Sequence, residues 1–243
     1  MMAKLVDTHF HLDYYRNHRQ LYEIINELEQ YTLCMTSSPG VFVSCQRMYK
    51  ETAYLKFALG FHPREKSLSS KDFSDFLILA SKVNYIGEVG MDFSSDAYIS
   101  RSLQIDYFEK IVEMCARRNI LMSVHLRKSE NEAIKIIKKY HPQKCIIHWF
   151  TGSVSQLSQL ISLGCYFSVN ANMVQNRSTS QKVMQIPCEK ILVESDGPFT
   201  KVNGKKYSPE RLREEYAIIE SCLNITNLKE IVLSNFTALL QKH

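Results

Sequence analysis

Short apolar runs alternate with amphipathic stretches along the whole of this 243-residue chain. In residues 102–118, Leu103, Tyr107, Ile111 and Cys115 recur every four positions, which is the spacing of one helix face. Further helix-like stretches cover residues 20–30, 74–82 and 130–140. Eight apolar runs have the length and composition of strands, at residues 4–8, 32–36, 54–60, 85–89, 121–126, 144–149, 165–169 and 190–194.

This alternation repeats a strand and a helix every 25 to 30 residues or so, roughly the size of a βα unit, and is typical of parallel α/β folds. We expect an α/β fold, a (β/α)8 TIM barrel, built as a single domain over residues 1–243. A doubly wound open sheet is the alternative. It is disfavoured because polar residues that end the first, fourth, fifth, sixth and eighth strands could not all meet across an open sheet.

Composition adds limits to this picture. Hydrophobic residues make up 45% of the chain and charged residues 23%, which is ordinary for a globular protein. The seven scattered cysteines include no C-x-x-C pair, so we expect reduced thiols and neither a disulfide framework nor a cysteine-built zinc site. Without a signal-like start or a long apolar run, a cytoplasmic protein with no membrane partner is expected. The net charge of +5 permits polyanion binding without showing it.

Candidate metal ligands stand at the ends of the strand-like runs. In a parallel barrel these ends form one face, where side chains from distant segments converge. Histidines two positions apart on a strand point to the same side. Nitrogen and carboxylate donors that converge in this way suit two divalent ions, and two-ion sites are a common device for hydrolysis. The candidate ligands are His9, His11, Glu88, His125, His148 and Asp196.

The two carboxylates of this set have the clearest chemical roles. Glu88 and Asp196 follow apolar runs, where a buried charge without a partner would be costly and bound cations would remove the cost. Glu88 can bridge two ions through its two oxygens. Asp196 can bind one ion and accept a proton from the bound water, whose pKa a metal lowers towards ~7. We therefore expect both residues to be catalytic.

The segment after the last strand-like run, residues 198–208, has a character of its own. It carries three lysines (Lys201, Lys205 and Lys206) beside Phe199 and Tyr207, and we expect it on the same face as the ligands. It is either an ordinary solvated loop or a rim that contacts phosphates and offers rings to stacked bases.

Six short motifs occur in order along the chain: DTHFHLD at 7–13, GFHP at 60–63, IGEVGMD at 86–92, HLR at 125–127, HWFTG at 148–152 and ESDGP at 194–198. Together they resemble the successive signatures of the TatD family, metal-dependent deoxyribonucleases within the amidohydrolase-like barrels. The resemblance covers residues 5–198, with a weaker match at Asn235.

The resemblance implies two divalent ions, of Mg, Mn or Zn. One would be held by His9, His11, Glu88 and Asp196, and the second by Glu88, His125 and His148, with Glu88 bridging. His62 and Arg127 would approach the scissile phosphate, where the planar fork of an arginine can donate two parallel hydrogen bonds. Glu194, two residues before Asp196 and hence on the same strand face, would orient a ligand or bind metal itself.

Departures from the family pattern concern the substrate. Lys128 stands where the family usually has an acidic residue, and Trp149 where a small one is common. Trp149 is either a packing residue or a stacking platform for a base. Within the family, the chain length and the TSSP turn at residues 36–39 are most similar to the nuclease subunit of bacterial Qat anti-phage defence systems.

Three functions remain open at this point. The first is hydrolysis of DNA from an end, single-stranded or at the end of a duplex, alone or with other subunits of a defence complex. The second is hydrolysis of an amide or ester in a small or acyl substrate, because the same activated water attacks carbonyl groups. The third is a barrel that mainly binds a partner. His62, Arg127 and the lysines favour the first, and the complete ligand set disfavours the third.

Overall fold

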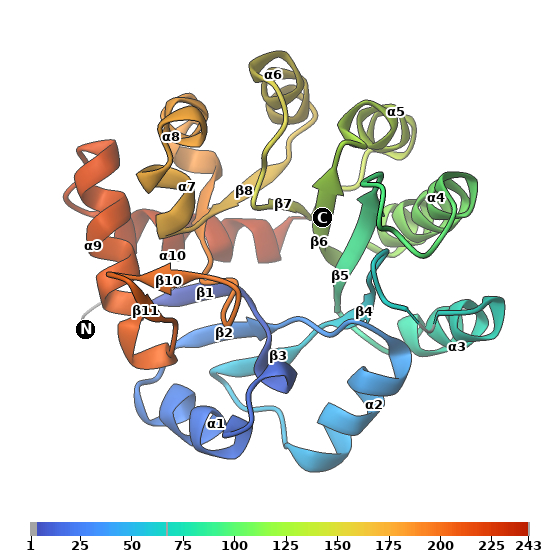
Figure 1. Ribbon diagram of the computed structural model, residues 1–243, viewed down its shortest axis with the longest axis horizontal. Coiled ribbons are helices and arrows are strands. Elements are labelled where there is room, and N and C mark those ends of the chain that lie inside the picture. Colours follow the sequence, from blue (N-terminus) through green and yellow to red (C-terminus); the bar gives the residue numbers. More distant parts are fainter. Residues whose placement is uncertain (1–3, 67, 243) are drawn as a thin grey trace.

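The computed structural model describes residues 4–66 and 68–242, and in it parallel strands form a ring surrounded by helices (Figure 1). Each of the paired neighbours around the ring runs parallel. The strands are β1 (Val6–Phe10), β2 (Tyr31–Cys34), β3 (Leu55–Phe57), β4 (Leu59–Phe61), β5 (Tyr85–Asp92), β6 (Leu121–Arg127), β7 (Cys145–His148), β8 (Tyr166–Val169) and β9 (Ile191–Val193).

The ring closes through two junctions. The strand predicted at residues 54–60 is divided at Ala58, so that β3 pairs with β2 while β4 pairs with β5. The Ala58 amide donates to the Cys34 carbonyl oxygen at 2.8 Å and ties the two halves together. On the opposite side, the Asp196 amide donates to the His9 carbonyl oxygen at 2.9 Å and links the end of β9 to β1. The predicted (β/α)8 barrel is therefore confirmed, and the open sheet is excluded.

Local sequence signals set the helix ends. Ser69 with Asp72, and Ser153 with Gln156, form reciprocal capping boxes at the starts of α3 and α6, while Asn119 ends α4 in the left-handed conformation. The four stretches predicted from periodicity are helical to within a few residues. The helices are α1 (His18–Glu27), α2 (Pro39–Met48), α3 (Ser70–Ala80), α4 (Arg101–Arg118), α5 (Glu130–Tyr140), α6 (Val154–Ser162), α7 (Ala171–Gln175), α8 (Arg177–Val183), α9 (Leu212–Leu223) and α10 (Leu228–Gln241).

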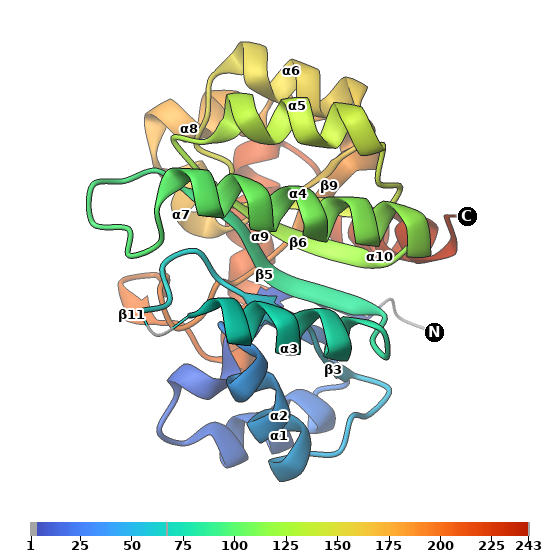
Figure 2. The ribbon, with the colours of Figure 1, turned by 90° about the vertical axis from the view of Figure 1, so that its right-hand side faces the viewer.

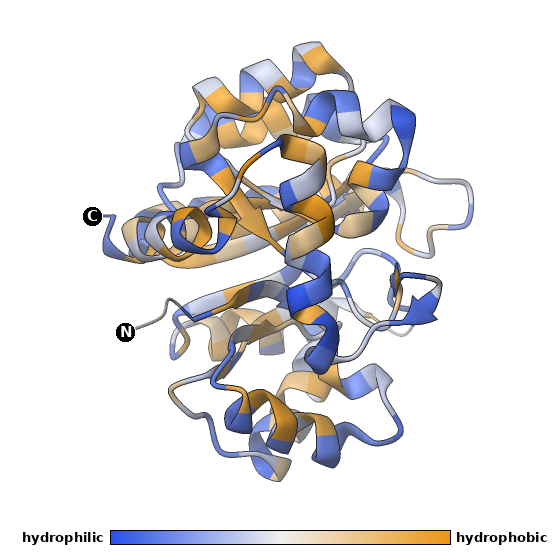
Figure 3. Cartoon of the chain, turned by 90° about the vertical axis from the view of Figure 1, so that its left-hand side faces the viewer, coloured by the Kyte–Doolittle hydropathy of each residue, from blue (hydrophilic) through white to orange (hydrophobic). Residues whose placement is uncertain are grey.

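The barrel strands are buried on both sides, which explains why most of their residues are apolar without the alternation of a half-exposed strand. Figure 3 shows hydrophobic residues facing the strands and hydrophilic ones facing outward. Inside the barrel, a Cβ on Gly87 would lie 2.3 Å from the Met35 sulfur, so a side chain beneath Glu88 would force Met35 to move. None of the helices in the described part of the chain combines the length and hydropathy needed to span a bilayer.

The two ends of the barrel differ. Helix α10 runs across the amino-terminal ends of the strands, where the Asn235 amide donates to the carbonyl oxygens of Cys188 and Ile191 at 2.7 and 2.8 Å. The segment after β9 forms a short antiparallel hairpin, β10 (Lys201–Val202) and β11 (Lys205–Lys206). In side view this hairpin lies at the end of the barrel opposite α10 (Figure 2). The carboxyl ends of the strands thus remain open.

Candidate metal centre

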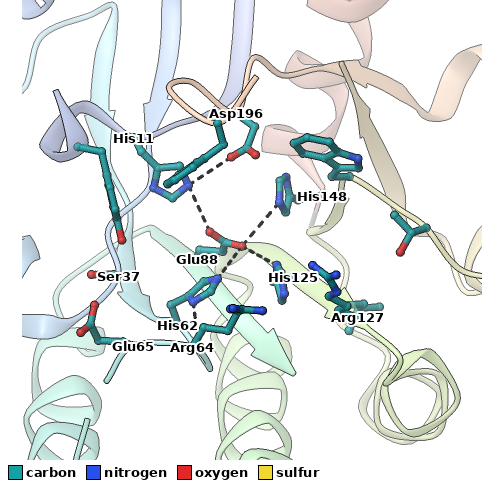
Figure 4. A pocket seen from close by; sticks show the side chains of 15 residues that line it. His11, Ser37, His62, Arg64, Glu65, Glu88, His125, Arg127, His148 and Asp196 are labelled. Carbon is teal, nitrogen blue, oxygen red and sulfur yellow. Dashed lines mark hydrogen bonds and ion pairs between the residues drawn. The ribbon is translucent and has the colours of Figure 1, made fainter. Parts of the chain in front are cut away.

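A cavity of about 780 Å³ opens at the carboxyl ends of the strands. Glu88 of β5 stands at its centre, and histidines at or just past the ends of β1, β4, β6 and β7 surround it (Figure 4). The cavity is lined by His11, Tyr14, Ser37, His62, Arg64, Glu65, Glu88, His125, Leu126, Arg127, His148, Trp149, Thr151, Asp196 and Phe199.

Four buried side chains form what we call the inner group: His9, His11, Asp196 and the Oε2 atom of Glu88. The two histidine Nε2 atoms lie 3.2 Å apart. Glu88 Oε2 is 3.4 Å from the first of them and 3.3 Å from the second. Asp196 Oδ1 lies at 3.8 and 3.4 Å from the same two nitrogens. Each of the two histidine nitrogens therefore lies within 3.8 Å of the other and of both carboxylate oxygens.

These spacings fit a metal ion. A tetrahedral site with bonds of about 2.1 Å has ligand–ligand distances of about 3.4 Å, and the five distances above lie between 3.2 and 3.8 Å. Two imidazoles and two carboxylates are a common donor set for divalent ions. Moreover, His9 Nδ1 is 2.9 Å from the Ser123 hydroxyl, which holds the ring with Nε2 facing the group.

A second set of donors, the outer group, gathers on the other oxygen of Glu88. Its Oε1 atom lies 2.9 Å from His125 Nδ1, 3.1 Å from His62 Nε2 and 3.7 Å from His148 Nε2. His62 was expected only beside the substrate phosphate. The structure places it in the metal-competent cluster, because β4 ends directly beside β5. Glu88 thus faces both groups, as a bridging carboxylate would.

Buried acceptors behind the histidines orient them. Glu194 Oε2 lies 2.9 Å from His148 Nδ1, and its other oxygen accepts from the Asn170 amide at 2.9 Å. Asp92 Oδ2 lies 3.2 Å from His125 Nε2. A carboxylate that accepts from the distal nitrogen fixes the tautomer and the direction of a metal-binding histidine. Sequence reasoning assigned no role to Asp92 or Ser123, although Asp92 ends the IGEVGMD motif.

The strand ends are locally irregular where they carry the cluster. Gly90 has φ of +147°, and a Cβ there would lie 2.0 Å from the His125 carbonyl oxygen, so only glycine lets β5 approach β6 so closely. Asp196 and Trp149 have positive φ angles of 47° and 37°, which residues other than glycine rarely adopt. Strand β9 ends at Val193, so the expected shared strand face of Glu194 and Asp196 is wrong. The chain turns between them, and Glu194 points behind His148.

Mutual contacts shift the pKa values within the cluster. Burial raises the pKa of Glu88, but the surrounding histidines outweigh burial and hold it well below its usual range. For His11, burial lowers the pKa, but hydrogen bonds to Asp196 and Glu88 dominate and raise it to about 10. His148 behaves similarly beside Glu194, with a pKa raised to about 9. The carboxylates thus favour positive charge on His11 and His148, whereas burial lowers the pKa of His9 and His62 and keeps them neutral nitrogen donors.

Basic residues stand around the cluster. Arg127, at the end of β6, and Arg64 both line the cavity. Arg64, which sequence reasoning missed, donates to Asp96 at 2.5 Å and lies 3.4 Å from Asp92. Trp149 lines the cavity with its ring beside His148, at 6.3 Å between centroids.

The lysine-rich segment agrees only in part with expectation. Lys201, Lys205 and Lys206 are exposed on the hairpin, and they do not line the cavity among the described residues. Phe199 is exposed at the cavity, whereas Tyr207 is buried with its hydroxyl 3.3 Å from Asp7. Tyr207 as a stacking ring is therefore wrong, because it packs beneath the site instead.

Known proteins are similar to this chain in sequence and in fold. The family model described as "TatD related DNase" matches residues 6–241. The chain is 30% identical over 172 residues to deoxyribonuclease Tat-D of Schizosaccharomyces pombe, which covers 70% of this chain and 53% of that protein. It is 25% identical to an uncharacterized metal-dependent hydrolase of Buchnera aphidicola over 97% of this chain and 98% of the relative. The crystal structure of YjjV, a TatD homologue from Escherichia coli, superposes with a TM-score of 0.87 at 18% identity over 100% of both chains.

Proposed function

Since this chain belongs to the TatD related DNase family of metal-dependent hydrolases, we propose that it hydrolyses phosphodiester bonds in DNA, starting from an end. The proposal includes two divalent ions, of Mg, Mn or Zn, and a single catalytic domain over residues 1–243. The observation that carries it is the pair of donor groups on the two oxygens of Glu88, set in a cavity lined by Arg64 and Arg127.

The inner group would hold one ion through His9, His11, Glu88 and Asp196. Glu88, His125 and His148 would hold the second, with His62 as a further nitrogen on the outer group. Bound there, divalent ions would supply Lewis-acid polarisation of a phosphoryl oxygen and a water of lowered pKa. Glu88 Oε1 lies 2.9 to 3.7 Å from the three histidine nitrogens of the outer group, so these donors face a common point where an ion would bind.

The protein's own groups would complete the reaction. Asp196 contributes its Oδ1 atom to the inner group, and its second oxygen would accept the proton of the attacking water. Arg127 and Arg64 bind the non-bridging phosphate oxygens, because a guanidinium donates two parallel hydrogen bonds to such a group. Trp149 contacts the nucleotide from the side of His148.

The direct test is digestion of end-labelled single-stranded and duplex DNA with added Mg²⁺, Mn²⁺ or Zn²⁺. Metal-dependent shortening from one end supports the proposal. The matched control adds a chelator, which should abolish hydrolysis while far-UV circular dichroism stays that of a barrel. Hydrolysis of amide or ester substrates but not of DNA would instead support the amidohydrolase alternative.

The cationic surroundings test the substrate class. Arg127→Ala should slow DNA hydrolysis far more than that of a small activated phosphodiester. Joint replacement of Lys201, Lys205 and Lys206 by alanine should flatten the salt dependence of DNA binding, because each lost phosphate contact removes roughly 0.7 to 0.9 from the log–log slope. An unchanged slope would mean that the hairpin does not contact DNA and is an ordinary solvated surface.

The proposed setting is a cytoplasmic anti-phage system of the Qat type, in which the chain acts with other subunits. This proposal rests on the resemblance of the chain length and of the TSSP turn at residues 36–39, in which Ser37 lines the cavity and Ser38 caps α2. Plaque assays with wild type and a Glu88→Ala variant, each expressed with its neighbouring genes, test it. Equal protection by the wild type and the variant would mean that defence does not depend on hydrolysis.

A further inference from the structure

Two exposed aromatic rings stand at the cavity beside His11. Tyr14 is 48% exposed and Phe199 54% exposed, although both are large apolar groups. Among the exposed large hydrophobic side chains of the described residues, these are the two that line the cavity. Such rings gain little from burial in the free protein, so their position calls for a partner that enters the cavity.

The rings form a corner with the metal-cluster histidine. Tyr14 and Phe199 pack edge to face at 5.1 Å between centroids. Each also meets the His11 ring edge to face, at 5.6 Å for Tyr14 and 5.4 Å for Phe199. The geometry therefore places two exposed rings in direct contact with His11 of the inner group.

The backbone ties this corner to the cluster. Tyr14 belongs to the short 3-10 helix Leu12–Tyr14 that starts directly after His11. The Phe199 amide donates to the Asp196 carbonyl oxygen at 2.8 Å. Tyr14 thus follows His11 after β1, and Phe199 follows Asp196 after β9, the two strands that close the barrel. The backbone therefore sets the distance of both rings from the inner group.

We propose that the Tyr14–Phe199 corner stacks one of the two bases that flank the scissile phosphate, which makes these residues determinants of substrate position. The inference rests on the proposed phosphodiester hydrolysis. Arg127 lies across Glu88 from His11 (Figure 4). A phosphate held between them would direct its base towards the rings and the sugar–phosphate chain towards the arginine. Every base has a π face, so this contact is tolerant of sequence.

A second consequence concerns the state of the substrate. A base that lies against Phe199 or Tyr14 has left its neighbours in the stack and its pairing partner, which costs free energy in a duplex. The corner therefore favours a DNA substrate whose terminal bases are free to turn outward. A DNA end with an abasic residue at this position loses the stacking contact but keeps every phosphate.

The test compares intact single-stranded oligonucleotides with matched ones that carry an abasic residue at the terminal or penultimate position of the digested end. The wild type should cleave at least one abasic substrate about 5- to 150-fold more slowly in kcat/KM, the range expected for one lost stack. The double variant Tyr14→Ala/Phe199→Ala should slow on the intact substrate by a similar factor. Its rate on the abasic substrate should match that of the wild type, so discrimination disappears.

Matched variants separate stacking from disturbance of His11. Phe199→Tyr keeps a ring and should keep discrimination, whereas Phe199→Leu keeps apolar bulk and should weaken it. Tyr98→Ala removes a ring that is 57% exposed outside the cavity lining and should change nothing. Discrimination that survives in the double variant, or equal slowing on intact and abasic substrates, would overturn the inference. Absence of DNA cleavage by the wild type would instead overturn the proposed function itself.

Discussion

The inner and outer groups share Glu88 but differ in their surroundings. The side chains of His9, His11 and Asp196 are 0%, 5% and 8% exposed, whereas in the outer group His62 and His125 are 17% and 18% exposed and only His148 is buried, at 6%. The inner group is held by β1 and by the turn after β9, which close the barrel. In the outer group, His62 just past β4 and His125 of β6 border the cavity, beside the more buried His148 of β7.

This difference assigns the two groups different tasks. Donors shielded from solvent favour tight, lasting binding of an ion, because water rarely reaches the ion to displace it. Donors that border the cavity can exchange water and meet a substrate oxygen. We therefore expect the inner group to anchor and the outer group to receive the phosphate, and the following changes separate the two.

The largest effect is expected for Glu88→Ala, because it removes one donor from each group. Activity should fall by more than about 10⁴-fold, beyond the range of a lost general base alone. Metal analysis of the purified variant should show both ions depleted. Retention of one full equivalent would mean that Glu88 does not bridge.

Asp196→Asn should act on the inner group alone. The amide keeps the shape and one coordinating oxygen but removes the charge that accepts the proton of the water, so activity should fall by about 10²- to 10⁴-fold. Single-turnover rates at saturating metal measure this loss without a contribution from binding. Activity within a few-fold of wild type would take the base role away from Asp196.

Asp92→Asn should act on the outer group and on the neighbouring Arg64, and leave the inner group intact. The carboxylate of Asp92 accepts from His125 and also pairs with Arg64. Loss of its charge should reduce metal affinity or activity by about 10- to 100-fold, as is usual for groups that orient ligands. A titration of activity with metal detects the change. Asp106→Asn, which removes an exposed ion pair with Lys110, serves as the control and should leave the titration unchanged.

The smallest effect concerns pH and the metal-free protein. The pKa values of His11 and His148 are raised in the fold, to about 10 and about 9, so their stabilisation is present in full below the ordinary value of 6.5. It is lost as the pH rises through the folded values. The melting temperature of the metal-free protein should therefore fall between pH 7 and 10 or so. Bound metal replaces the protons and should flatten this slope, as parallel thermal scans would show.

Much of the fold was predictable because its signals are local. Apolar runs of strand length and four-residue helical spacing depend only on neighbours in the chain, and the predicted helix at Glu130–Tyr140 agrees to the residue. The convergence of His9, Glu88 and His148 follows from barrel topology, which brings the carboxyl ends of all strands to one face. The division of the predicted third strand at Ala58 was missed, since it depends on which neighbours each half pairs with.

The sequence by itself thus determined the barrel, the end of it that carries chemistry and the residue types gathered there. Only the tertiary structure decided which atoms meet. Ser123 supports His9 across 114 residues of chain, His62 joins the cluster from β4, and Tyr207 is buried against Asp7 rather than exposed at the rim. Such contacts depend on packing between distant segments at a scale of a few tenths of an ångström. Periodicity and spacing carry no information at that scale, because they describe each segment without its neighbours.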